Sequence, residues 1–202
     1  MFIDYVTLML LNVMIGLFLL GALVLKGIDS ENRRQWAPGF LVVGLVALLC
    51  GLHMAWTWPL PGAYNSAYGE LSALFGAIFL GAGMALWKDW RLTSLAPYAL
   101  FGGLVSILIG IRIINLGMTN APVLSGIGFI LTGLGGVLFV PLALWTKKPI
   151  VRWTLALALF AAGAIWLFTS LMAYWGHMKR FEKYTPPTMQ KPAAESPGPQ
   201  EE

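Results

Sequence analysis

Six apolar runs, each long enough to cross a lipid bilayer, constrain this chain more than any other feature. A bilayer has about 30 Å of hydrocarbon, which a helix crosses in about 20 residues. Hydrocarbon offers the backbone no hydrogen-bond partner, and the runs do not alternate as the strands of a barrel do, so each run must be helical. The sequence therefore predicts an all-α, polytopic integral membrane protein. The predicted spans are residues 5–25, 38–58, 71–87, 96–114, 122–145 and 153–175.

The composition agrees with a membrane protein and excludes several other classes. Apolar and aromatic residues make up 58% of the 202 residues and charged residues only 11%, which is too few charges for a soluble domain. A disordered chain and a nucleic-acid-binding protein are excluded too, since the net charge is only +4. The single cysteine, Cys50, cannot form an internal disulfide. We therefore expect the lipid bilayer, and not nucleic acid, to be the partner of this chain.

Basic residues gather on one side of the predicted spans. The loops after the first, third and fifth spans carry eight Lys and Arg, whereas loops 59–70 and 115–121 carry none. By the positive-inside rule, the basic loops are cytoplasmic and both termini are extracytoplasmic. Three basic residues after the last span, Lys179, Arg180 and Lys183, oppose this orientation.

The two ends of the chain differ in character. Asp4 precedes the first span, and no basic segment or small-residue cleavage site marks a removable signal peptide, so we expect an uncleaved anchor. Five prolines follow the last span without any apolar periodicity, which is typical of a disordered tail. We therefore predict a transmembrane domain at 1–180 and a disordered tail at 181–202.

Two parts of the chain resemble each other. Residues 44–53 align with 103–112 with their glycines in register, and 76–83 aligns with 128–135. This predicts that the second and third spans form a helical hairpin that is duplicated, in the same orientation, in the fourth and fifth spans. Chance similarity between glycine-rich apolar helices is the alternative. In either case, small residues at four-residue spacing predict close contact between helices.

Few ionisable residues lie outside the basic loops and the tail, and all are predicted near the extracytoplasmic ends of the spans. Ionisable groups below the membrane interface are costly and by default mark a site. The alternative is that these residues are solvated among the lipid headgroups. We expect a charge pair between Glu70 and Arg112, and a change of protonation at His53 near neutral pH. The set comprises Asp4, His53, Glu70, Arg112 and His177, with Asn115 and Asn120 beside them.

The segment between the second and third spans is rich in aromatic residues. It runs from Trp56 to Glu70 with two prolines, four aromatic residues and no Lys or Arg. We predict that it folds over the helix ends as a lid that walls a pocket above His53, and an interfacial aromatic belt is the simpler alternative. The candidate ligand-binding residues are His53, Trp56, Trp58, Tyr64, Asn65, Glu70, Arg112, Asn115 and His177.

Several blocks of residues resemble a known family. They are Gly51-Leu52-His53-Met54, Thr57-Trp58-Pro59-Leu60-Pro61-Gly62, Gly110-Ile111-Arg112-Ile113-Ile114-Asn115-Leu116-Gly117 and Tyr174-Trp175-Gly176-His177. Up to about residue 180, the chain is similar to a prokaryotic membrane family catalogued as a domain of unknown function, number nine hundred and eighty-one. The resemblance implies a six-helix, multi-pass protein of the bacterial or archaeal cell membrane, and it implies no established activity.

Three functions fit these observations. The first is binding of a ligand or ion in an extracytoplasmic pocket, as in a small carrier or sensor. The second is a b-type haem or metal redox protein with His53 and His177 as ligands, Glu70 and Asp4 completing a metal site, or Arg112 pairing with a haem propionate. The third is a non-catalytic accessory subunit or scaffold, in a membrane complex or a homo-oligomer. An enzyme is the least supported class, because no hydrolase, zinc-protease or nucleotide-binding motif is present.

Overall fold

The computed structural model describes residues 5–26, 28, 31–144 and 148–185, with only the backbone at 142–144. The regular structure in these ranges is entirely helical, and six helices are long and apolar enough to cross a membrane. The prediction of an all-α, multi-pass membrane protein is therefore confirmed. Asp4 and most of the predicted tail lie outside the described residues. The six helices are α1 (Val6–Lys26), α2 (Ala37–Thr57), α3 (Leu71–Trp87), α4 (Ala96–Leu116), α5 (Pro122–Leu144) and α6 (Pro149–Phe181).

Prolines and a glycine explain several helix boundaries. Pro38, Pro97 and Pro149 lie in the first turns of their helices, where a missing N–H breaks no hydrogen bond. α4 ends at Gly117, which has a φ of 61° and so takes the left-handed conformation that glycine adopts without strain. Short helical elements precede three of the spans: the 3₁₀ helices η1 (Arg33–Trp36) and η3 (Leu92–Leu95) and the π-helix η2 (Asn65–Glu70).

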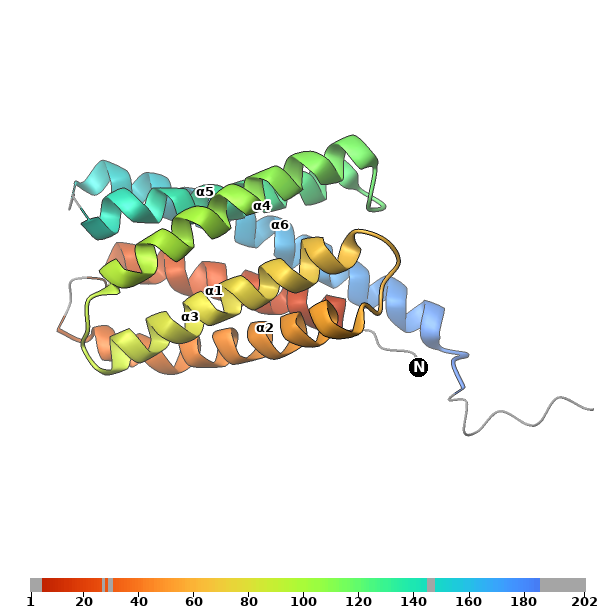
Figure 1. Ribbon diagram of the computed structural model, residues 1–202, viewed down its shortest axis with the longest axis horizontal. Helices are drawn as coiled ribbons and strands as arrows, with labels where there is room; N and C mark the ends of the chain where they lie inside the picture. The colour runs from red at the N-terminus through yellow and green to blue at the C-terminus, as the bar shows by residue number, and fades with distance from the viewer. Residues whose placement is uncertain (1–4, 27, 29–30, 145–147, 186–202) are drawn as a thin grey trace, which may run out of the picture.

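The six helices pack as three antiparallel pairs. α2 lies against α3, α4 against α5 and α1 against α6, and α5 also contacts α6 (Figure 1). The contacts between α3 and α4, and those between α1 and α2, are much sparser. The helices are therefore tightly joined within each pair, and the space between the pairs is more loosely filled.

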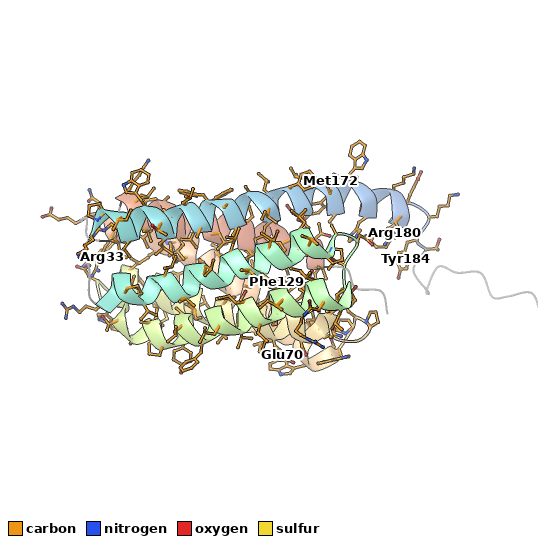
Figure 2. The ribbon with its side chains drawn as sticks, turned by 90° about the horizontal axis from the view of Figure 1, so that it is seen from above. Arg33, Glu70, Phe129, Met172, Arg180 and Tyr184 are labelled. Carbon is orange, nitrogen blue, oxygen red and sulfur yellow. The ribbon has the colours of Figure 1, made fainter. Side chains whose placement is uncertain are left out.

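The two ends of the bundle differ in their side chains. The start of α1, the end of α6 and the α2–α3 and α4–α5 connections lie together at one end (Figure 1). We call it the histidine end, because His53 and His177 lie there. The opposite end, which we call the basic end, contains Arg33 and its ion-pair partner Asp89. Figure 2 shows Arg33 at one end of the molecule and Arg180 at the other.

Glycines bring two of the three pairs into backbone contact: α2 with α3 and the preceding η2, and α4 with α5. Four glycine pairs approach so closely that a Cβ on the first glycine would lie 2.5–2.9 Å from the carbonyl oxygen of the second. Within each helical segment, the two glycines of this kind are seven residues apart. The predicted close contact between small residues is thus present, and side chains larger than hydrogen do not fit there. The pairs are Gly44 with Gly76, Gly51 with Gly69, Gly103 with Gly133, and Gly110 with Gly126.

The duplication of the hairpin stays a prediction, but the helix contacts of the glycines indicate which residues of the two hairpins would correspond. Gly76 contacts α2 as Gly133 contacts α4. The sequence comparison instead paired Gly76 with Gly128, and Gly128 lies against Trp166 of α6. If the hairpin is duplicated, Gly76 of the first copy therefore corresponds to Gly133 of the second.

Polar side chains inside the bundle are bonded to neighbouring groups. The indole of Trp166, which is 2% exposed, donates to the Thr132 hydroxyl at 3.0 Å, and this hydroxyl donates to the Gly128 carbonyl at 2.8 Å. The Ser106 hydroxyl donates to the carbonyl of Phe129 at 2.7 Å. Such bonds join helices where no water is available to satisfy polar groups.

Candidate functional site

His53 lies in a small polar cluster between the first turn of α1 and the last turn of α2. Its Nδ1 is 2.9 Å from the Tyr5 hydroxyl and 3.4 Å from the Thr57 hydroxyl, and the Thr57 hydroxyl also donates to the His53 carbonyl at 2.7 Å. The Tyr5 ring meets the imidazole edge-on, with the ring centroids 5.4 Å apart. The Tyr5 hydroxyl can donate to the imidazole nitrogen or accept from it, depending on the tautomer of His53. His53 therefore ties α2 to the start of α1.

Asn65 closes the α2–α3 loop. It is completely buried, its Oδ1 accepts from the Leu60 N–H at 3.0 Å, and its Nδ2 donates to the carbonyls of Leu60 and Gly62. Trp56 and Trp58 are 78% and 50% exposed, so their rings lie on the surface. The aromatic loop is thus a compact turn held by Asn65, and its two tryptophans do not cover His53.

Glu70 and Arg112 are both exposed and do not form the expected charge pair. Glu70 accepts a hydrogen bond from the Ser66 hydroxyl at 3.0 Å, and the part of the chain that the structure describes contains no ion pair between Glu70 and Arg112. Asn115, one turn beyond Arg112, is exposed as well. Figure 2 shows Glu70 at the edge of the bundle, away from Arg180. Glu70 and Arg112 therefore lie at a similar depth in the bundle but do not form a common site.

His177 lines a cleft of about 400 Å³ between α5, α6 and the α4–α5 connection. Its Nδ1 is 3.0 Å from the Thr7 hydroxyl of α1, and its ring packs against that of Phe181. We call this space the histidine-end cleft. Its polar lining consists of Thr119, Asn120, Ser125, Thr169, His177 and Arg180, and its apolar lining includes Tyr68, Leu124, Phe168 and Met172.

The start of α1 lies between the two histidines. His53 is bonded to Tyr5 and His177 to Thr7. Tyr5 directly precedes α1 and Thr7 lies in its first turn, so each histidine is bonded to a different residue at the start of α1. Among the described residues, no group of three or more His, Cys, Asp or Glu side chains could hold a metal ion.

Sequence reasoning missed Arg180, Thr119, Ser125 and Tyr68 as members of the cleft. α6 continues to Phe181, six residues beyond the predicted end of the last span, and carries Arg180 on its final turn. Apolarity defines where a helix leaves the membrane, but a helix can continue into the polar region. The absence of proline from residues 176–185 is compatible with a continued helix and was the available signal.

A family described as protein of unknown function (DUF981) matches residues 1–180, which include all six helices except the last residue of α6. No curated protein and no solved structure matches the chain. The resemblance inferred from the residue blocks is confirmed over the same region. The chain therefore belongs to the DUF981 family of membrane proteins of unknown function.

Proposed function

We propose that this protein binds an anionic amphiphile from the membrane in the histidine-end cleft. The observation that carries this proposal is the mixed lining of the cleft. One part offers the guanidinium of Arg180, the imidazole of His177 and the amide of Asn120, while another part offers the apolar side chains of Phe168 and Met172. A molecule with an anionic head and a hydrocarbon body matches both parts.

The charges of the cleft favour an anion. Arg180 is the charged residue in the lining, and the lining contains no Asp or Glu among the described residues. Arg180 also forms no ion pair with a described carboxylate, so its charge is available to a ligand. A guanidinium presents paired N–H groups that fit phosphate and carboxylate oxygens. Thr119 and Asn120 add neutral hydrogen-bonding groups beside it.

The position of the cleft favours a ligand that comes from the bilayer. Phe168 and Met172 lie on α6 and are 57% and 58% exposed, so the apolar part of the lining is continuous with the surface of a membrane-spanning helix. Arg180 lies at the end of the same helix, where lipid headgroups are expected (Figure 2). A lipid can therefore reach the cleft laterally, with its head toward Arg180.

We also infer that the histidine end is extracytoplasmic. The basic end contains Arg33, Arg34, Lys88 and Arg91, and the connections at the histidine end contain no basic residue. The positive-inside rule supports this orientation.

The proposed binding can be tested by thermal unfolding in phosphatidylcholine nanodiscs that contain increasing fractions of phosphatidylglycerol. A ligand that binds only the folded protein raises Tm as its concentration rises. We expect this rise in the wild-type protein and a much smaller one in Arg180→Gln, because the substitution removes the cation of the cleft. Equal rises in the two proteins would contradict the proposal.

A matched control separates the cleft from general surface charge. Lys179 is the neighbour of Arg180, has the same charge, and does not line the cleft. Lys179→Gln should therefore keep the wild-type response. Inorganic phosphate, added to pure phosphatidylcholine nanodiscs, provides the comparison with a free anion. A rise of Tm with phosphate equal to that with phosphatidylglycerol would show that the source is soluble and not the membrane.

A further inference from the structure

Two more cavities lie deeper in the bundle than the histidine-end cleft. The first, which we call the middle cavity, has a volume of about 60 Å³ and includes Met9, Leu10 and Tyr68 in its lining. The second, which we call the inner cavity, has a volume of about 80 Å³ and includes Leu23 and Leu92, which lie toward the basic end. The three spaces together extend along most of the bundle.

Neighbouring spaces share some of their lining side chains. Tyr68 lines the cleft and the middle cavity, and its ring packs edge-on against Phe129 with the centroids 5.4 Å apart. Phe75, Phe79 and Thr132 line both the middle and the inner cavity. The cleft and the two cavities are therefore arranged in series.

The helix packing explains why these spaces exist. The glycine contacts draw α2 onto α3 and α4 onto α5, whereas contacts between α3 and α4 are sparse. Interior space is therefore left where the tightly joined pairs face one another. Phe75 and Phe79, one turn apart on α3, lie at this position.

The polarity of the lining falls from the histidine end inward. The cleft contains a cation and several hydrogen-bonding groups. The middle cavity contains Asn12, Ser72, Ser106 and Thr132, whereas the inner cavity has Thr132 as its polar residue.

Asn12 is the most buried amide of the middle cavity, with 7% exposure. Its side-chain NH₂ donates to the Val43 carbonyl at 2.9 Å, which joins α1 to α2 beside this cavity.

We infer that the amphiphile is an anionic glycerolipid, one chain of which enters the bundle from the cleft. Its charged head lies beside Arg180 in the cleft, and its hydrocarbon passes Tyr68 and the middle cavity into the inner cavity. This inference rests on the proposed function and adds the ligand class and its path. An apolar cavity of about 150 Å³ admits a benzene-sized molecule. The middle and inner cavities, of about 60 and 80 Å³, are each smaller than this, so together they hold only a short stretch of one chain, past the ring of Tyr68.

The inference can be tested by photo-crosslinking in nanodiscs of phosphatidylcholine that contain a phosphatidylglycerol with a diazirine near the end of one acyl chain. Leu45 and Leu49 on the exposed face of α2 should be labelled by surrounding lipid and serve as an internal reference. We expect additional adducts on residues of the inner cavity, such as Leu20 and Phe40. Adducts confined to exposed residues would overturn the inference.

A pair of variants on α3 makes the test specific. Ala82 lines the inner cavity and is 8% exposed, so Ala82→Leu should fill the cavity and abolish the interior adducts. Ala77 is exposed, and Ala77→Leu adds the same volume outside the bundle and should leave the interior adducts unchanged. If Ala82→Leu does not fold, Ala47→Leu in the middle cavity replaces it. Equal interior adducts in the filled and control variants would overturn the inference.

The Tm measurement and the crosslinking measurement together separate a failure of this inference from a failure of the proposed function. A Tm increase that depends on Arg180, together with adducts only on exposed residues, would overturn the inference and leave the headgroup site intact. Interior adducts that persist in Arg180→Gln would support the chain path and contradict the headgroup contact.

Discussion

Asp89 joins two segments of the basic end through its charge. Its carboxylate accepts from Arg33 Nε at 2.5 Å and lies 3.6 Å from Arg34 Nη2, and Arg33 also donates to the Asp89 carbonyl at 2.7 Å. The hydrogen bond from Arg33 lowers the pKa of Asp89, and the charges of both arginines act in the same direction. Asp89 thus links the α1–α2 connection to the end of α3.

A lowered pKa predicts the direction of a pH effect on stability. The pKa of the Asp89 carboxyl is lower in the folded protein than in the unfolded chain, where it is close to 3.8. The charged carboxylate therefore stabilises the folded state. The stabilisation is complete above pH 3.8 and is lost as the pH falls below it. Asp89→Asn should therefore lower Tm at pH 7, by a difference that shrinks in acid. Glu182→Gln is the control, and a difference independent of pH would contradict the assignment.

Asn65 was a candidate ligand-binding residue, and its contacts favour a structural role. Removing its side chain leaves the backbone groups of Leu60 without their partners, which costs about 1–3 kcal/mol when they are buried. Asn65→Ala should lower the free energy of unfolding by about this amount, as measured by denaturant titration in micelles. Asn115→Ala, at an exposed position, should change it by less than about 0.5 kcal/mol. Equal effects would show that loop closure is not the role of Asn65.

The helices are the elements that the sequence predicts best, because their determinants are local. Run length and the prolines at residues 38 and 97 place the helix starts of α2 and α4 within a residue of those observed. Two features could not be predicted. The π-helix Asn65–Glu70 depends on the packing of Gly69 against Met54, and the extension of α6 to Phe181 lies beyond the apolar run.

The glycine contacts within the hairpins predict a position-specific effect on stability. A Cβ on Gly103 would lie 2.5 Å from the Gly133 carbonyl oxygen, which is backbone and cannot move aside alone. Gly103→Ala should therefore push α4 from α5 and destabilise the protein by about 1–3 kcal/mol.

The matched control for Gly103 is Gly176 on α6. A Cβ there meets nothing within 4 Å, and alanine is a better helix former than glycine. Gly176→Ala should be neutral or stabilising in the same unfolding measurement. If Gly103→Ala is as stable as Gly176→Ala, backbone contact does not hold this hairpin together.

At the scale of the whole molecule, the sequence predicts how far along the bundle each polar residue lies. It does not predict on which side of the bundle that residue lies. His53, Glu70, Arg112 and His177 all lie toward the histidine end, as their places in the spans indicated. Whether they meet depends on which helices pair, and sequence periodicity does not determine that. The pairing of α1 with α6 puts the start of α1 between the histidines. The long α6 continues past His177 and adds Arg180, three residues further on, to the same cleft.

The inferred orientation has its own test. Alkaline phosphatase fused to the carboxyl end of the full chain should be active, because this enzyme matures only outside the cytoplasm, and a green fluorescent protein at the same position should be dark. Fusions within the α3–α4 connection, at the basic end, should give the opposite result. A fluorescent carboxyl-terminal fusion would show that the histidine end is cytoplasmic.

The central claim is that Arg180 holds an anionic lipid in the histidine-end cleft. Native mass spectrometry of the protein extracted from membranes measures this directly, because retained lipid adds its own mass. We predict that the wild-type protein and Lys179→Gln retain an anionic phospholipid at collision energies that strip it from Arg180→Gln. Equal retention by all three proteins, or retention of zwitterionic lipid alone, would contradict the account.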